Sequence, residues 1–301
     1  MLKRSLALAA ALAASAGLAL AAHSSPPGKF PVTVAAANGK VTIKKQPRRI
    51  VSLSPTATED LFAIAAGKQV VAVDDQSDYP RRAPRTKLSG LTPNAEAIAK
   101  LHPDLVVVQF DANKIVEALG KLGIPVLVEP SATTFGDAYG QIRQLGIATG
   151  HRKGAAHLVA TMKARIAALV AATPKPSRQL SVYHELTPDF YSATSKTFIG
   201  RVYALFGLKN IADAADSSGS GYPQLSGEYI LSADPDLIVL ADTRCCGQSR
   251  ATVAARPGWS TMTAVRHGTI LTVDDSIASR WGPRVVDFVR AVARAVRSVE
   301  G

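Results

Sequence analysis

The chain has 301 residues, enough for two modest domains, and carries a formal net charge of +12. Apolar residues make up 47% and charged residues 19%, which excludes an intrinsically disordered chain and favours packed cores. Arginine and lysine are scattered rather than clustered, so the charge does not indicate binding of nucleic acid and favours an anionic ligand only mildly.

The first 22 residues have the pattern of an export signal. Lys3 and Arg4 form a positive n-region, residues 6–20 form an apolar segment, and small residues around Ala21 provide a cleavage site. The apolar run falls short of the roughly 20 residues that a membrane-spanning helix needs. We expect residues 1–22 to be removed. Because no cysteine follows the apolar segment, we expect a soluble periplasmic protein without a lipid anchor.

Residues 23–48 are polar and are expected to form an N-terminal extension with one short strand over residues 41–43. From Arg49 onward, short apolar runs alternate with helical segments. Strands are predicted over residues 50–53, 70–73, 105–109 and 125–128, and helices over residues 60–66, 94–101 and 114–122. This alternation predicts a parallel sheet with helices on both faces.

One long helix is predicted over residues 151–173. The segment lacks proline, and apolar residues recur at steps of three and four, at Leu158, Met162, Ile166 and Leu169. At 1.5 Å per residue, such a helix would reach about 33 Å. Pro174 ends it.

After this helix the alternation resumes at residues 180–183. We therefore expect an α/β protein with two lobes of mainly parallel sheets, over residues 49–150 and 174–301, joined by one long backbone helix. Two such lobes bracket a cleft, which is a usual place for a small ligand.

The two lobes share a sequence repeat. Residues 96–108 align without a gap on residues 228–240, and six positions are identical, including the first glutamate and the Pro-Asp-Leu run. Glu96 and Glu228 each take the second position of a short helix, where the helix dipole favours a negative charge. Each can be an ordinary first-turn acid. As a pair they form a two-point charged surface that a membrane partner with two basic pockets could recognise.

The sequence lacks the usual signatures of catalysis. No dinucleotide fingerprint, phosphate-binding loop or nucleophile elbow occurs, and the six histidines form no close metal-ligand pair, so we expect neither an enzyme nor a protein-bound metal. For His184 a structural role is favoured over contact with the metal of a ligand. A metal-centred or hydrolytic enzyme on the same frame, or a sensor domain, remains an alternative.

The two cysteines, Cys245 and Cys246, are adjacent, which excludes a disulfide framework. Two thiols in a loop are the preferred interpretation. A ligand contact or a redox-labile bond between them is the alternative.

Taken together, the segments resemble the helical-backbone periplasmic binding proteins for cobalamin, ferric siderophores and haem. The similarity covers nearly all of residues 49–299 and rests on residues 49–59, 77–80, 94–96 with 102–105, 222–228 and 281–284. The Pro-Gln-Leu-Ser run from Pro223 most resembles the cobalamin-binding members.

This resemblance implies a monomeric solute-binding component of an ABC importer, without a cofactor of its own. Its ligand would be a metal chelate, cobalamin first and haem or a ferric siderophore otherwise. It implies that Glu96 and Glu228 dock on the membrane subunits. The implied ligand-binding residues are Ser54, Pro55, Thr56, Asp78, Tyr79, Phe110, Tyr191, Tyr222, Arg280 and Trp281.

Two chemical features fit such a ligand. The flat rings of Tyr191, Tyr222 and Trp281 suit a macrocycle. Arg280 and Arg284 could pair with a phosphate or carboxylate of the ligand, or could simply be solvated at the start of the last helix.

Overall fold

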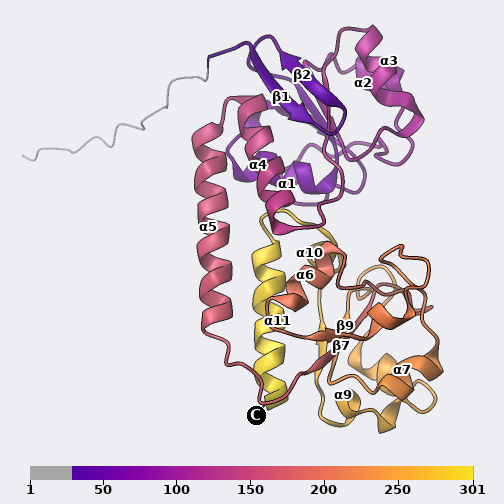
Figure 1. Cartoon of the computed structure of the whole chain (residues 1–301). Coiled ribbons are helices and arrows are strands. Elements are labelled where there is room, and N and C mark those ends of the chain that lie inside the picture. The colour runs from indigo at the N-terminus through magenta and orange to yellow at the C-terminus, as the bar shows by residue number, and fades with distance from the viewer. Residues whose placement is uncertain (1–28, 301) are drawn as a thin grey trace, which may run out of the picture.

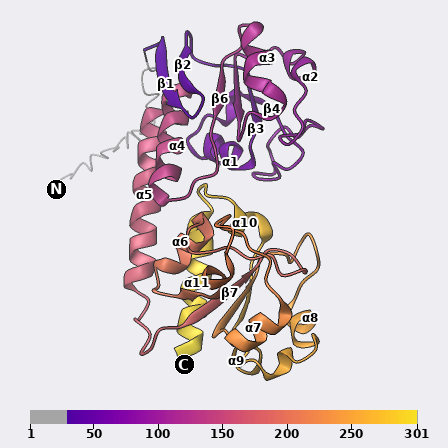
Figure 2. The ribbon, with the colours of Figure 1, turned by 45° about the vertical axis from the view of Figure 1, so that its right-hand side comes forward.

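The computed structural model describes residues 29–300, so the expected signal segment, residues 1–22, lies outside the described residues. Two α/β lobes lie one above the other along the helix α5 (Arg152–Ala171), as Figure 1 shows. In the turned view of Figure 2 the lobes remain separate and α5 still runs along one side of both. The expected arrangement of two lobes on a backbone helix is confirmed.

The N-terminal lobe is built on a four-stranded parallel sheet. Its elements are β3 (Ile50–Leu53), α1 (Pro55–Ala63), β4 (Val70–Val73), α2 (Ala95–Ala99), β5 (Leu105–Val108), α3 (Ile115–Lys121), β6 (Val126–Val128) and α4 (Phe135–Thr149). The strands lie in the order β4-β3-β5-β6. Strands β3, β5 and β6 are buried along their whole length, which is typical of a parallel sheet covered on both faces.

The C-terminal lobe repeats this plan. Its elements are β7 (Ser181–Glu185), α6 (Phe198–Ala204), β8 (Lys209–Asn210), α7 (Gly227–Ala233), β9 (Leu237–Leu240), α8 (Arg250–Ala254), α9 (Thr263–Arg266), β10 (Ile270–Thr272), α10 (Asp275–Ser279) and α11 (Val285–Glu300). The strands are parallel in the order β10-β9-β7-β8. Numbered along the chain within each lobe, both sheets have the order 2-1-3-4, so the sequence repeat reflects a repeated topology.

The aspartate of the repeat has the same structural role in both lobes. The Asp104 carboxylate accepts the backbone N–H groups of Arg48, at 2.8 Å, and Arg49, at 2.9 Å, directly before β3. The Asp236 carboxylate accepts the backbone N–H of Ser181, at 2.7 Å, where β7 begins. Each aspartate therefore ties the third strand of its sheet to the start of the first strand.

The core of the molecule runs along α5 and α11. The buried residues of α5 are Ala155, Val159, Met162 and Ile166, and they share one apolar cluster with Val289 and Val292 of α11. Among the described helices, α5 alone is long and apolar enough to cross a membrane by length and composition. Its apolar face packs against the rest of the molecule and Lys163 and Arg165 are exposed, which is the pattern of an amphipathic helix with one buried face.

The region expected to be a polar extension is part of the N-terminal lobe. β1 (Val32–Ala36) and β2 (Gly39–Ile43) form an antiparallel hairpin, and Val34 and Ile43 are buried in the core. The turn of the hairpin binds the edge strand β6, because Asn38 donates to the Val126 carbonyl at 2.9 Å and accepts the Val128 N–H at 3.1 Å. The hairpin thus covers a sheet edge that would otherwise be open.

In the N-terminal lobe, two helices differ from the sequence prediction. α1 begins at Pro55, five residues before the predicted start, because the Ser54 hydroxyl accepts the Ala57 N–H and forms the N-cap. Helix α4 was not predicted at all, although Thr134 and Asp137 form a capping box at its start. The predicted short helices of the repeat are confirmed, with Asn94 and Ser226 as their N-caps.

Candidate functional site

The carboxyl ends of the strands in the two lobes face each other. In a parallel sheet these ends share one edge, so the loops after β3, β4 and β5 lie together in one lobe and the loops after β7, β9 and β10 lie together in the other. Ion pairs between side chains connect the two edges. In both sheets the first connection and the next one run in opposite directions, and ligands of open α/β sheets bind at such a switch point.

Asp78, in the loop after β4, is the centre of one interlobe contact. Its carboxylate accepts a hydrogen bond from Arg280 Nη1 at 2.7 Å and another from Arg244 Nη1 at 3.2 Å, and both arginines belong to the C-terminal lobe. Burial by itself would raise the pKa of Asp78, but the hydrogen bond and charge of Arg280, with a smaller contribution from Arg244, hold that pKa below its ordinary value. Asp78 therefore remains ionised and joins the lobes.

Glu59, on α1, is the centre of a second interlobe contact. Arg284 donates to both of its carboxylate oxygens, at 2.8 and 2.5 Å, and Arg280 adds a third bond at 2.9 Å. The Arg284 guanidinium also lies over the Tyr79 ring, 4.4 Å from its centroid. The sequence suggested that Arg280 and Arg284 could pair with an anionic group of the ligand. In the structure both are paired with acids of the other lobe.

A small pocket of about 240 Å³ lies beside these contacts. Both lobes line it, through Asp75, Gln76, Asp78 and Arg85 on one side and Arg244, Cys245, Asp275, Ser276 and Arg280 on the other. A larger hollow of about 1140 Å³ lies elsewhere, between the β1–β2 hairpin and α3, at the amino ends of the N-terminal strands. We place the candidate site between the lobes, because loops after the strands of both sheets line the pocket there.

Four aromatic rings project from the loops that follow these strands. Tyr79 follows β4 and is 46% exposed, Phe110 follows β5 and is 40% exposed, and Tyr191 follows β7 and is 41% exposed. Tyr222 is 46% exposed, and its loop is bonded to that of Tyr191, because the Ser192 N–H donates to the Pro223 carbonyl at 2.9 Å. Each lobe therefore contributes two rings, and rings left this exposed have surface to offer a ligand.

The remaining predicted contacts are largely covered by protein. At the start of α1, Ser54 and Thr56 are buried and Pro55 is half-buried. The loop that carries Gly282 covers this turn closely, because a Cβ added to Gly282 would lie 3.5 Å from Thr56 Cγ2. Trp281 is only 8% exposed, and its Nε1 donates to Gln141 Oε1 at 2.7 Å. Trp281 was expected to line the cleft, but its hydrogen bond instead attaches the C-terminal lobe to α4.

Two further expectations concern His184 and the cysteines. His184 is fully buried, its Nδ1 lies 2.5 Å from the Tyr203 hydroxyl, and burial lowers its pKa to about 3, so its role is structural. Cys245 and Cys246 form a disulfide, so the expectation of two free thiols is wrong. A ligand contact of the cysteines was the alternative interpretation, but Arg244 of the same loop was missed as part of the site. The position of this loop directly after the apolar run of β9 was the signal that could have revealed it.

Glu96 and Glu228 are both exposed, each in the first turn of its helix, α2 or α7. Both helices precede the third strand of their sheet. The two carboxylates therefore occupy equivalent, solvent-facing positions, one on each lobe.

Comparison with known proteins agrees with this architecture. Residues 50–277 match the family described as periplasmic binding protein. An uncharacterized substrate-binding lipoprotein of an ABC transporter from Bacillus subtilis is 34% identical over 277 residues, which are 89% of this chain and 86% of the relative. The chain belongs to the periplasmic binding protein family. This family comprises extracellular or periplasmic solute-binding proteins of ABC transporters, which deliver ligands to membrane permeases and are not enzymes.

Two other proteins resemble this periplasmic binding protein over most of its length. The cobalamin-binding protein of Halobacterium salinarum is 34% identical over 275 residues, which are 88% of this chain and 74% of that protein. The periplasmic haem-binding protein of Roseiflexus sp. RS-1 shares the fold, with a TM-score of 0.73 and 23% identity, over 85% of this chain and 100% of the other.

Proposed function

We propose that this periplasmic binding protein captures cobalamin between its lobes and delivers it to the membrane subunits of its importer. The observation that carries the proposal is the set of four exposed rings on opposing strand ends, Tyr79, Phe110, Tyr191 and Tyr222. An exposed ring buries much apolar area when a flat ligand covers it. A corrinoid ring between the lobes would cover rings from both.

The polar groups between these rings suit a ligand with amide side chains. Asp78 is already paired with Arg244 and Arg280, so a ligand with a large net charge would have to break these ion pairs. Amide groups can share these donors and acceptors without breaking the pairs. The relationship to the Halobacterium protein supports the same ligand.

Delivery would use the outer faces of the two lobes. Glu96 and Glu228 are exposed on equivalent helices, and nothing in the described contacts occupies either carboxylate with a basic partner. Two basic pockets on the membrane subunits could recognise the pair, and the distance between them would select the correct orientation. Because α5 and the interlobe ion pairs brace the lobes, we expect only limited closure on binding. We also expect the protein to act as a monomer in the periplasm.

Titration calorimetry of the mature chain tests the ligand. We expect one cyanocobalamin to bind per chain, with no change in the ligand after recovery. Cobinamide, haem and a ferric hydroxamate serve as parallel ligands. Tight binding of haem or the hydroxamate with no binding of cyanocobalamin would reassign the ligand, whereas chemical turnover of any of them would overturn the transport assignment.

A further inference from the structure

The disulfide between Cys245 and Cys246 lies at the interlobe site. The loop that carries it connects β9, a central strand of the C-terminal sheet, to α8. Both cysteines are exposed, and Cys245 lines the pocket between the lobes. A thiol reagent in solvent can therefore reach a bond that lies within the candidate ligand site.

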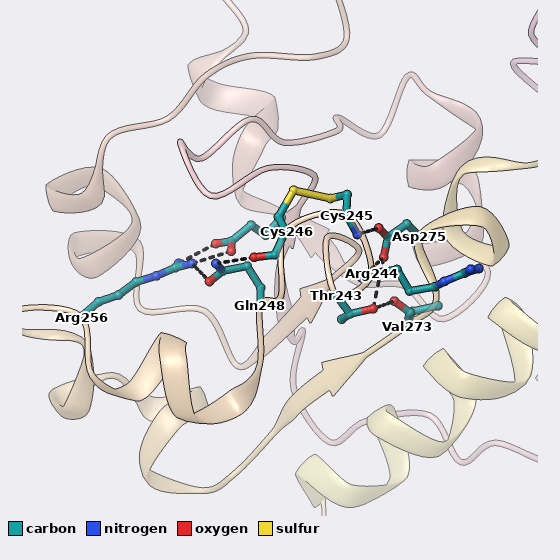
Figure 3. Close-up of a disulfide and its surroundings, with 9 residues drawn as sticks. Thr243, Arg244, Cys245, Cys246, Gln248, Arg256, Val273 and Asp275 are labelled. Carbon is teal, nitrogen blue, oxygen red and sulfur yellow. Dashed lines mark hydrogen bonds and ion pairs between the residues drawn. A yellow bond between two sulfur atoms is a disulfide. The ribbon is translucent and has the colours of Figure 1, made fainter. Parts of the chain in front are cut away.

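The loop is anchored on both sides of the disulfide, as Figure 3 shows. On one side the Asp275 carboxylate accepts the backbone N–H groups of Arg244, at 3.0 Å, and Cys245, at 2.8 Å. On the other side Gln248 lies 3.5 Å from the Cys246 carbonyl and accepts a hydrogen bond from Arg256 at 2.8 Å. The disulfide closes the short stretch between these two anchors.

Arg244 connects this loop to the other lobe. It directly precedes Cys245, and its guanidinium donates to Asp274 at 3.0 Å in its own lobe and to Asp78 at 3.2 Å across the site. The direction in which Arg244 points depends on the backbone of residues 244 and 245. The Asp275 carboxylate holds the N–H groups of both residues, and the disulfide ties Cys245 to Cys246 on the other side. A change at the sulfur atoms therefore reaches an interlobe ion pair through one peptide unit.

We propose that the Cys245–Cys246 disulfide is a reducible site that controls the ion pair between Arg244 and Asp78. The reductant is a dithiol. One of its thiolates attacks a protein sulfur and forms a mixed disulfide, and its second thiolate then displaces that sulfur. The dithiol leaves as a cyclic disulfide, and the protein gains two electrons and two protons as two cysteine thiols. With the covalent restraint removed, the Arg244 backbone gains freedom and the bridge to Asp78 opens more often.

Hydrogen exchange read by mass spectrometry tests this without any ligand. Complete reduction, verified by thiol counting, should speed amide exchange in residues 242–249 and, across the site, in residues 75–79. Because an exposed ion pair contributes only modestly to stability, we expect up to about fivefold faster exchange in residues 75–79.

Two variants separate the effect of the disulfide from the effect of the bridge between Arg244 and Asp78. In Arg244→Gln the disulfide remains but the bridge is absent, so reduction should change exchange only in residues 242–249. In Cys245→Ser/Cys246→Ser the reductant should change nothing, and residues 75–79 should already exchange fast. The proposal is overturned if the isolated, air-oxidised protein contains two free thiols, or if full reduction leaves residues 75–79 unchanged in the unmodified chain.

Discussion

Arg284 of the C-terminal lobe and Glu59 of the N-terminal lobe form a bidentate ion pair, with Nε 2.8 Å from Oε2 and Nη2 2.5 Å from Oε1. The Glu59 side chain is 1% exposed, so its charge depends entirely on partners from the other lobe. Removing these two charges from water is costly, and the two parallel bonds together with the Arg280 contact offset that cost. The relative position of the lobes is thus set by buried charge as well as by α5.

Arg284→Met should destabilise the protein, because it leaves Glu59 buried with Arg280 as its only ion-pair partner. We expect a loss of about 3 kcal/mol in the free energy of unfolding, measured by urea denaturation. Arg290→Met is the matched control, since Arg290 pairs with Asp287 on the surface of α11, and it should cost less than about 1 kcal/mol. Equal losses in the two variants would show that the interlobe ion pair stabilises the fold no more than a surface ion pair does.

Reversing both lobe-surface acids, in Glu96→Lys/Glu228→Lys, should abolish uptake of cobalamin by cells and leave its affinity for the purified protein unchanged. The reason is that both carboxylates are exposed and lie outside the interlobe site. Glu117→Lys/Asp287→Lys makes the same change in net charge on other exposed positions and should leave uptake intact. Persistent uptake in the first variant would refute docking through these two residues.

Removing an exposed ring should weaken ligand binding without loss of stability. Tyr191→Ala or Tyr222→Ala should raise the Kd for cyanocobalamin about tenfold, as calorimetry would measure, because a covered ring contributes roughly 1 kcal/mol or more. The melting temperature should change little, since both tyrosines are exposed in the free protein and lie outside its core. Leu122→Ala, an exposed apolar side chain on the far side of the lobe, is the control. An unchanged Kd in both tyrosine variants would remove the rings from the site.

Glu129, at the end of β6, should make the protein less stable at high pH. Burial raises the pKa of this carboxyl to about 8, above the value of 4.5 for an unfolded chain. The folded state therefore holds the proton more tightly, and stability falls as the pH rises from 4.5 towards 8. In Glu129→Gln this fall should be reduced, with a difference on the order of 3 kcal/mol between pH 5 and pH 9 in urea denaturation. Glu117→Gln, at a surface position, should leave the pH profile as it is.

Much of the architecture could be predicted from local patterns. A short apolar run bounded by polar residues is itself the signature of a buried parallel strand, so β3, β4 and β5 were predicted to within one residue. The exposure of Glu96 and Glu228 was also predictable from local sequence, because each is the second residue of a short helix after an N-cap and faces solvent there. The repeat also indicated the two-lobe plan, since similar sequences form similar local structure.

The pairings between distant residues could not be predicted in this way. The sequence marks Arg280, Arg284 and Asp78 as polar, but their charges can be satisfied by solvent, a ligand or each other. The choice depends on how the two lobes approach, since Asp78 and Arg280 lie 202 positions apart in the chain. Trp281 gives no local sign of burial. The hairpin of β1 and β2 packs on the edge strand β6 and on the apolar core, both of which are formed by distant segments.

By itself, then, the sequence determined the strands β3, β4 and β5, the two-lobe plan and the acids on the lobe surfaces, since these depend on neighbours within a few residues. Tertiary structure alone decided which charges meet between the lobes, which rings stay exposed and where the disulfide lies. Those properties depend on the packing of distant segments, which no local pattern encodes.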